Sequence, residues 1–307
     1  MNDGVLEERI RKEGFKGEAR RQAPMREITS FKIGGPADLI LFPQDLEDLQ
    51  VLITLFRREG IEYLVLGNGT NLLVSDKGVR DPLISLSEGF KEIKTEGTKI
   101  RAEGGVGLPQ LLHFCAENAL GGMEPLAGIP GTVGGGIRMN AGSWGVEMED
   151  LLSSVTVMGH LGQIRWLEKE KLVFSYRGID LPAEEIILQG EFTLQKGERE
   201  EIKARMEDFL RRRRETQPFA LPSAGSIFKN PQGISAGKLI EGVGLKGFRL
   251  GDAMISPLHA NFIVNLGTAR AKDVLRLMDL IEERVYQERG VKLEREVVII
   301  GEPNVAE

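Results

Sequence analysis

Gly128-Ile129-Pro130-Gly131-Thr132-Val133-Gly134-Gly135-Gly136 is the most distinctive stretch of the chain. Glycine has no Cβ and lets main-chain N–H groups approach a ligand closely, and Pro130 fixes part of the backbone. Such a composition builds few packed elements. It is typical of an irregular loop that wraps around a pyrophosphate, with a hydroxyl supplied by Thr132. The alternative is a set of ordinary turns between strands.

A second glycine loop, Gly67-Asn68-Gly69-Thr70-Asn71-Leu72, follows the short apolar run 63–66. The dinucleotide fingerprint G-x-G-x-x-G would need glycine at position 72 and a helix after it. Residues 72–74 instead continue as a strand, so the Rossmann fold is excluded. A loop of successive N–H groups between two strands can still bind an anion.

Predicted helices and strands alternate along the chain, without a fixed-period repeat or a low-complexity linker. Apolar residues spaced three to four apart predict the helices, and short apolar runs predict the strands. The helices cover 45–59, 198–215 and about 271–288, and the strands 37–42, 63–66, 155–158, 185–188, 259–265 and 297–300. We expect Thr268 to cap the last helix and Gly290 to end it. This pattern predicts an α+β fold with a mixed sheet.

Composition narrows the classes of function. The chain has 307 residues, which suggests roughly two domains, and its net charge of −6 gives no overall attraction to nucleic acid or an anionic membrane. The single cysteine, Cys115, excludes a cysteine-rich metal site and lies on an apolar helix face, so we predict a core residue. Three scattered histidines lack ligand spacing, and no metal site is expected. No signal peptide or membrane span is visible, which predicts a cytoplasmic protein.

Two short motifs suggest other chemistry and are rejected. Ser226-Ile227-Phe228-Lys229 fits the S-x-x-K motif of penicillin-recognising serine hydrolases, but the companion S-D-N and K-T-G motifs are missing. Residues 233–239 superficially suggest a phosphate-binding P-loop, yet the glycine spacing is one residue short and Leu239 stands where Ser or Thr is required. A helix capped by Ser235 explains the second motif better.

Seven strings then occur in a characteristic order. They are 29–37 (TSFKIGGPA), 67–74 (GNGTNLLV), 126–135 continuing to 139–142 (LAGIPGTVGG, MNAG), 174–177 (FSYR), 223–231 (SAGSIFKNP), 259–265 (HANFIVN) and 293–297 (LEREV). Together they resemble the UDP-N-acetylenolpyruvoylglucosamine reductase (UDP-N-acetylmuramate dehydrogenase) family, in particular its compact second type. Thr70 departs from the serine usual in the family, and Gly178-Ile179 departs where a serine often follows the arginine.

The resemblance implies an FAD-binding domain of the vanillyl-alcohol-oxidase (PCMH) type in two subdomains, 1–80 and 81–197. A C-terminal α/β substrate-binding domain would cover 198–307. The expected FAD contacts are Gly67, Asn68, Gly69, Thr70, Asn71, Gly131, Thr132 and Arg213. No histidine or cysteine lies in the glycine loops, so we expect FAD to be bound non-covalently.

The resemblance also implies the reaction. NADPH would reduce FAD, and UDP-N-acetylglucosamine enolpyruvate would then accept a hydride from flavin N5, giving UDP-N-acetylmuramate for peptidoglycan synthesis. The expected catalytic residues are Arg177, which holds the substrate carboxylate, Ser226, the proton donor, and Glu296, the acid that helps to polarise the carboxylate. The expected substrate-binding residues are Tyr176, Lys229, Asn230 and Asn261. The protein would act as a monomer.

Two further functions stay open at this point. One is another FAD oxidoreductase of the same fold that acts on a sugar or a hydroxy acid. The other is a flavin- or nucleotide-sugar-binding protein without turnover. The family contexts of Arg177, Ser226 and Glu296 favour the reductase over both.

Overall fold

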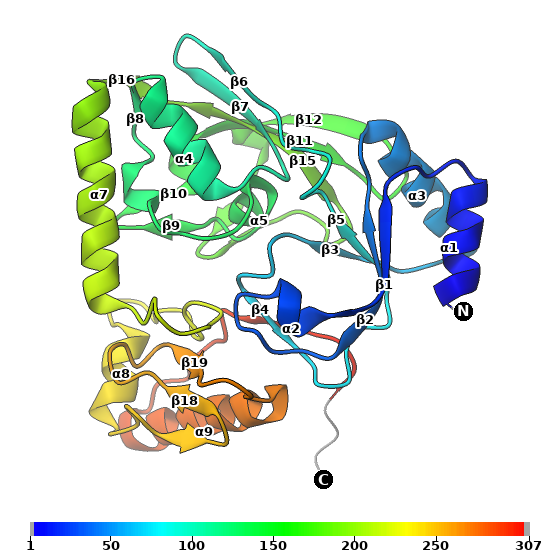
Figure 1. The fold of residues 1–307 in the computed structure, drawn as a ribbon. Coiled ribbons are helices and arrows are strands. Elements are labelled where there is room, and N and C mark those ends of the chain that lie inside the picture. The colour runs from blue at the N-terminus through cyan, green and yellow to red at the C-terminus, as the bar shows by residue number, and fades with distance from the viewer. Residues whose placement is uncertain (1–2, 304–307) are drawn as a thin grey trace. The chain divides into compact units, whose positions relative to one another are not determined.

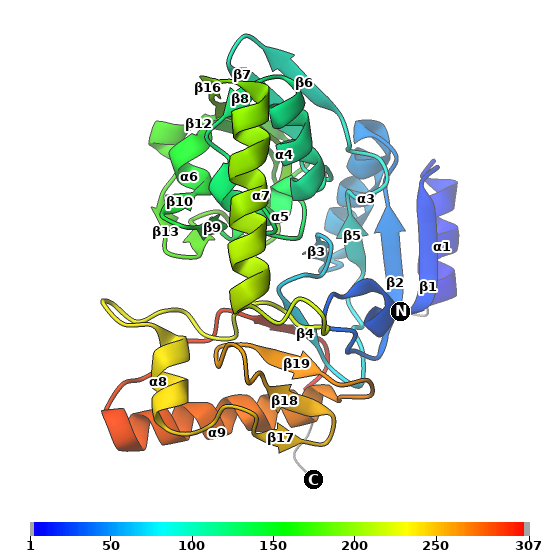
Figure 2. The same ribbon diagram turned by 60° about the vertical axis from the view of Figure 1, so that its left-hand side comes forward.

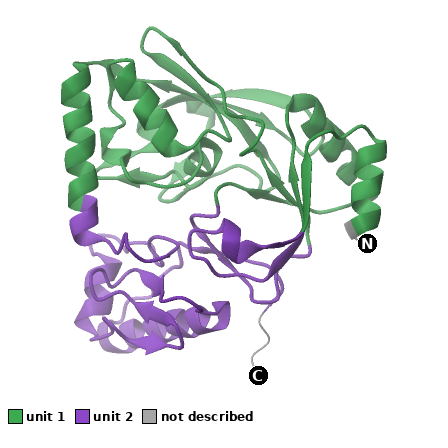
Figure 3. Ribbon diagram, in the orientation of Figure 1, with its two compact units in different colours: residues 1–21, 39–68, 81–212 green, residues 22–38, 69–80, 213–307 purple. Residues whose placement is uncertain are grey.

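The computed structural model describes residues 3–303, which form two units, each built from three chain segments (Figure 3). Unit 1 comprises the residues up to 21 together with 39–68 and 81–212. Unit 2 comprises 22–38, 69–80 and the residues from 213 onward. The expected boundaries at residues 80 and 197 divide the chain differently and stay a prediction. No helix within 3–303 is long and apolar enough to cross a membrane.

The first sheet has four strands in the order β1-β2-β5-β3, and all of it lies in unit 1 except residues 22–24 of β1 and 36–38 of β2, which belong to unit 2. These are β1 (Glu18–Pro24), β2 (Pro36–Phe42), β5 (Leu83–Ser85) and β3 (Leu64–Leu66), and α1 (Asp3–Lys12) and α3 (Leu46–Glu59) accompany them (Figure 1). Both β2 and β3 pair with β5 in parallel. The predicted helix 45–59 is confirmed as α3. Asp45 caps this helix by accepting a hydrogen bond from the Asp48 N–H.

The second sheet of unit 1 is antiparallel and has the order β12-β11-β15-β7-β6. Its strands are β12 (Ile164–Glu168), β11 (Leu152–Met158), β15 (Ile186–Thr193), β7 (Lys99–Glu103) and β6 (Ile93–Glu96). The accompanying helices are α4 (Leu108–Glu117), α5 (Val133–Arg138), α6 (Met148–Leu151) and α7 (Arg199–Thr216), whose last turn belongs to unit 2. Cys115 on α4 is buried in this core, as predicted, and burial raises the pKa of its thiol to about 12.

Short elements complete unit 1. Three two-stranded ladders are formed by β8 (Leu120–Gly121) with β16 (Gln195–Lys196), β9 (Gly142–Ser143) with β10 (Val146–Glu147), and β13 (Phe174–Ser175) with β14 (Gly178–Ile179). The single-turn helices are η1 (Glu124–Leu126) and η2 (Lys169–Lys171). The last two ladders are tight hairpins that carry residues of the candidate site.

The prediction of an irregular loop over the whole 128–136 stretch is wrong from residue 133 onward. There the chain forms α5, whose first turn is capped by the hydroxyl of Thr132. Gly136 allows close packing and does not mark a flexible loop. A Cβ at this position would lie 2.8 Å from Cε of Met148 and 3.3 Å from a methyl of Leu108. Composition alone does not separate a flexible glycine from one that lets a helix pack closely.

Unit 2 has its own core, which residues of all three of its chain segments form. Its strands are β4 (Leu72–Val74) paired in parallel with β20 (Val298–Ile300), and the antiparallel sheet of β17 (Arg249–Leu250), β18 (Ala253–Ile255) and β19 (Ile263–Asn265). Its helices are α2 (Met25–Ile28), α8 (Ala236–Gly242) and α9 (Ala271–Arg289). Figure 2 shows α9 lying along the β17–β19 sheet.

The structure of unit 2 tests three predicted helix ends and one predicted strand. Ser235 caps α8 and Gly290 ends α9 with a φ of 67°, as expected. The predicted strand 259–265 is wrong in its first half, since residues from His259 turn before β19 begins at Ile263. Thr268 does not cap α9. The first N–H groups of that helix donate to the carboxylate of Asp76 instead, at 2.8 and 3.1 Å.

Candidate functional site

The two glycine loops meet inside unit 1. A Cβ placed on Gly67 would lie 3.1 Å from Oγ1 of Thr132, so the turn after β3 lies against the start of α5. Thr132 is buried and accepts a hydrogen bond from the Gly135 N–H at 3.2 Å. The carbonyl of Gly131 accepts from the Leu108 N–H at 2.9 Å. Two loops predicted separately to bind a phosphate group are therefore neighbours, whereas Asn68 beside them is exposed.

The rest of the first loop, residues 69–71, belongs to unit 2. The Gly69 carbonyl accepts from the Ser30 N–H at 3.2 Å, and the Thr70 carbonyl accepts from the Ser30 hydroxyl at 3.4 Å. The Asn71 side chain donates to the Glu296 carbonyl at 3.1 Å, and the Asn71 carbonyl accepts from the Val298 N–H at 3.0 Å. Asn71 thus fixes the segment that carries Glu296, and its role toward a cofactor stays a prediction.

Ser226 and Glu296 lie on hydrogen-bonded neighbouring segments of unit 2. The Ile227 carbonyl, one residue after Ser226, accepts from the Glu296 N–H at 2.8 Å. Phe228 forms an isolated antiparallel bridge with Arg295, and the Lys229 N–H donates to the Glu294 carbonyl at 2.8 Å. Both Ser226 and Glu296 are half-buried. Main-chain pairing therefore brings together two of the three predicted catalytic residues.

The predicted substrate residues of unit 2 cluster around the same segment. The Asn261 amide accepts from the Phe228 N–H at 3.0 Å and donates to the Phe228 carbonyl at 2.7 Å, so one buried side chain completes both main-chain bonds of that residue. Asn230 accepts from the N–H of Ala236 at the start of α8, and Lys229 pairs with Glu294 at 2.5 Å. Asn261 thus supports the Ser226 segment, and its binding of substrate stays a prediction.

Arg177 lies in unit 1, at the turn of the β13–β14 hairpin. Tyr176 and Arg177 form the two-residue connection, because Ser175 pairs directly with Gly178. Arg177 has a φ of 62°, in the left-handed region that side-chain-bearing residues rarely adopt. Its guanidinium lies 4.7 Å from the centre of the Tyr176 ring, a cation–π distance. The two predicted residues of this unit are therefore in contact.

A carboxylate that the sequence did not single out holds the same guanidinium. Glu147 Oε1 lies 3.0 Å from Arg177 Nη1, and the Gly142 carbonyl accepts from Arg177 Nη2 at 3.2 Å. Burial raises the pKa of Glu147, an effect that the adjacent Arg177 charge opposes. The sequence offers only an indirect signal, Gly145, which favours a turn and does not identify Glu147; in the structure Trp144 and Gly145 both have positive φ in the turn between β9 and β10.

Arg213, the predicted phosphate contact on the basic helix, is buried in unit 2. Its Nη1 donates to the Gln217 side chain at 3.4 Å. Burial lowers the pKa of the guanidinium, because removing a charge from water is unfavourable. A buried guanidinium can bind an anionic group, and the role of Arg213 toward a cofactor phosphate stays a prediction.

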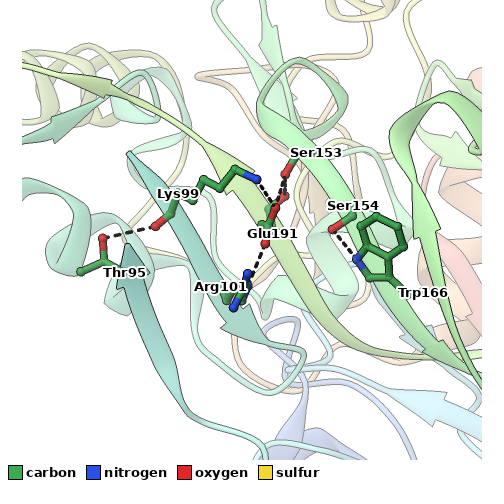
Figure 4. A network of polar contacts seen from close by, with 7 residues as sticks. All are labelled: Thr95, Lys99, Arg101, Ser153, Ser154, Trp166 and Glu191. Carbon is green, nitrogen blue, oxygen red and sulfur yellow. Dashed lines mark hydrogen bonds and ion pairs between the residues drawn. The ribbon is translucent and has the colours of Figure 1, made fainter. Parts of the chain in front are cut away.

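The other prominent polar cluster, on the five-stranded sheet, contains none of the predicted residues (Figure 4). Glu191 on β15 accepts from Lys99 at 3.2 Å, Arg101 at 2.7 Å and the Ser153 hydroxyl at 3.1 Å. These bonds hold the pKa of Glu191 below its usual value in spite of burial. The cluster joins strands β7, β11 and β15, and we assign it to sheet stability. Within residues 3–303, no three His, Cys, Asp or Glu side chains are arranged to bind a metal.

Known proteins resemble this chain over nearly its full length. Residues 37–168 match the FAD binding domain family, and residues 217–300 match the C-terminal domain of UDP-N-acetylenolpyruvoylglucosamine reductase. The reductase of that name from Syntrophus aciditrophicus is 43% identical over 98% of both chains, and that from Caldanaerobacter subterraneus is 44% identical over 97% of this chain and 99% of its own. The crystal structure of the Thermus caldophilus reductase has a TM-score of 0.78 at 40% identity and covers 92% of this chain and 98% of its own. These matches confirm the predicted fold, an FAD-binding domain followed by a C-terminal domain.

Proposed function

Because the chain belongs to the UDP-N-acetylenolpyruvoylglucosamine reductase family, we propose that it reduces UDP-N-acetylglucosamine enolpyruvate to UDP-N-acetylmuramate, with NADPH as the electron donor. The step would serve peptidoglycan synthesis, and the enzyme would act in the cytoplasm as a monomer. Similarity across 98% of both chains supports this function over a different oxidoreductase on the same FAD-binding fold.

The residues present fit a bound FAD. A Cβ on Gly67 would lie tightly against Oγ1 of Thr132, at 3.1 Å, and glycine avoids this contact, so main chain rather than a side chain lies at the junction of the two loops. We propose that Gly67, Asn68, Gly131 and Thr132 in unit 1, and Gly69, Thr70, Asn71 and Arg213 in unit 2, contact FAD. When bound, FAD would supply the hydride that NADPH provides.

The chain's own residues would stabilise charge and deliver the proton. Addition of a hydride to an enolpyruvyl double bond leaves negative charge that spreads into the carboxylate. Arg177 offers a planar set of donors that matches a carboxylate, and we propose that it holds this group. Ser226 would give its proton to carbon, because a carbanion-like enolate is a base strong enough for a positioned hydroxyl. Glu296, held beside the Ser226 segment by main-chain bonds, would help to polarise the carboxylate. Tyr176, Lys229, Asn230 and Asn261 would line the nucleotide-sugar site.

The pairing of the Ser226 segment with the Glu296 segment is the observation that carries this assignment, because it places the segments of two proposed catalytic residues side by side. The test is an anaerobic absorbance titration of the FAD-loaded protein. We expect NADPH to bleach the oxidised flavin band and the enol ether to restore it. Bleaching by NADPH without recovery on addition of the enol ether would contradict the proposed substrate. Recovery of the flavin band on addition of a keto sugar or a keto acid, the oxidation products of a sugar or a hydroxy acid, would support the alternative oxidoreductase. No flavin binding after reconstitution would contradict the function as a whole.

A further inference from the structure

Glu147 and Arg177 connect two hairpins of unit 1. Glu147 ends β10 and pairs across the hairpin with Gly142, so the two residues that accept hydrogen bonds from Arg177 Nη1 and Nη2 form one rung of the β9–β10 ladder. We propose that Glu147 is a positioning residue, which sets the plane of the Arg177 guanidinium, and that Asn140 in turn fixes Glu147. This inference rests on the proposed function, in which Arg177 holds the substrate carboxylate.

An arginine in this position needs such support. Its side chain has several rotatable bonds, and their rotamer entropy works against a single orientation. The hairpin fixes only the Arg177 main chain, and it does so in a strained left-handed conformation. Contacts at two guanidinium nitrogens, one to a carboxylate and one to a main-chain carbonyl, define the plane of the group. A guanidinium held at Nη1 and Nη2 cannot rotate about its last bonds without losing one of them.

Asn140 supplies the next layer of support. It is buried, with a φ of 39°, and its Nδ2 donates to Glu147 Oε2 at 2.9 Å and to the Ser175 carbonyl at 3.2 Å. Its Oδ1 accepts from the Glu149 N–H at 3.1 Å. One amide thus joins the carboxylate of the first hairpin to the strand that leads into the Arg177 turn. Each oxygen of Glu147 has its own partner, so the carboxylate is fixed in rotation as well as in place.

The test is a double-mutant cycle on the FAD-loaded enzyme, with NADPH and the enol ether as substrates. We expect Glu147→Ala to lower kcat about 10–100-fold, by analogy with the range found when residues that orient metal ligands are removed. Glu147→Gln keeps an acceptor oxygen and should retain part of this activity. In the Arg177→Ala background, Glu147→Ala should have no further effect, because positioning matters only when the guanidinium is present. Calorimetric binding of the enol ether to the oxidised enzyme, without NADPH, should show the same pattern in affinity.

Asp180→Asn is the matched control, since it removes an exposed carboxylate just after β14 and should leave kcat within about twofold. Thermal midpoints of all variants separate misfolding from mispositioning. Equal losses from Glu147→Ala in the wild-type and Arg177→Ala backgrounds would overturn the proposal, as would full activity of Glu147→Ala. A wild-type protein that binds flavin but does not turn over the enol ether would instead contradict the proposed function.

Discussion

Arg177 and Ser226 are held in place in two different ways. The Arg177 guanidinium in unit 1 depends on side chains, because its contacts include the Glu147 carboxylate and the Tyr176 ring. Ser226 in unit 2 depends on main chain, because the residues that follow it pair with the segment around Glu296. A long side chain acts at its far end and needs partners there, whereas a short hydroxyl goes where its backbone is placed. The first arrangement should be sensitive to single substitutions and the second should resist them.

The largest effect should come from removing the reacting groups of unit 2. Ser226→Ala and Glu296→Gln each keep the main-chain pairing, so we expect the thermal midpoint to stay within a few degrees while kcat falls about 10²–10⁴-fold, the range of general acid catalysis. Steady-state kinetics and thermal unfolding check this together. Unfolding of either variant would show that these side chains, rather than the backbone, maintain the segment.

The next effect concerns the side chain that completes the main-chain pairing. Asn261→Ala leaves both the N–H and the carbonyl of buried Phe228 without a partner, and each such group costs about 1–3 kcal/mol. We expect the free energy of unfolding to fall by about 2–6 kcal/mol in a denaturant titration. Asn230→Ala, which loses one bond at the start of α8, is the matched control and should lose about 1 kcal/mol. Equal losses in the two variants would contradict this account.

A smaller effect should appear at the strained turn of unit 1. Arg177→Ala keeps a side chain at a φ of 62°, whereas Arg177→Gly removes the steric cost of that conformation. Left-handed backbone costs side-chain-bearing residues about 1–2 kcal/mol, so the glycine variant should be the more stable by about 1 kcal/mol although both variants lose activity. Chemical denaturation of the pair measures the difference. An alanine variant as stable as the glycine variant would mean that the turn relaxes.

The smallest effect is a pH dependence in unit 2. Burial lowers the pKa of His259 below its usual value of 6.5, helped by the charge of Lys246 and opposed by Glu241. The unfolded chain therefore binds a proton more readily, so this stabilisation is present above about pH 6.5 and is lost as pH falls below that value. His259 Nδ1 accepts from the Asn261 N–H at 3.3 Å, a bond that protonation would break. His259→Gln should reduce the loss of stability between about pH 7.5 and about pH 5.5; an unchanged loss would exclude His259 as its source.

Local patterns predicted the elements whose ends are set nearby. Apolar spacing located α3 and α9, and Ser235 and Gly290 marked helix ends because capping involves residues a few positions away. The cap of α9 could not be found this way, since Asp76 comes from a distant part of the chain. The helix at 133–138 was missed because its glycines resemble those of a loop.

The same distinction between local patterns and distant contacts applies to the residues of the candidate site. Ser226 and Glu296 were expected from motifs, and the structure supplied the main-chain pairing that joins their segments. Glu147 and Asn140 could not be assigned from sequence, because their contact with Arg177 and Ser175 exists only once two hairpins have packed together. Motifs identify reacting groups, whereas the residues that orient them depend on tertiary contacts.

The pairing of β4 with β20 also limits how early in translation unit 2 can finish folding. Residues 72–74 have their partner strand at 298–300, which is 298 − 72 = 226 positions later. At roughly 5–20 residues per second on the ribosome, β4 waits on the order of 10–45 seconds for that strand to emerge. During this interval the Asn71 segment is an open strand edge, which is a template for wrong pairing. Unit 2 is thus completed last in translation, although two of its three segments are made before residue 81.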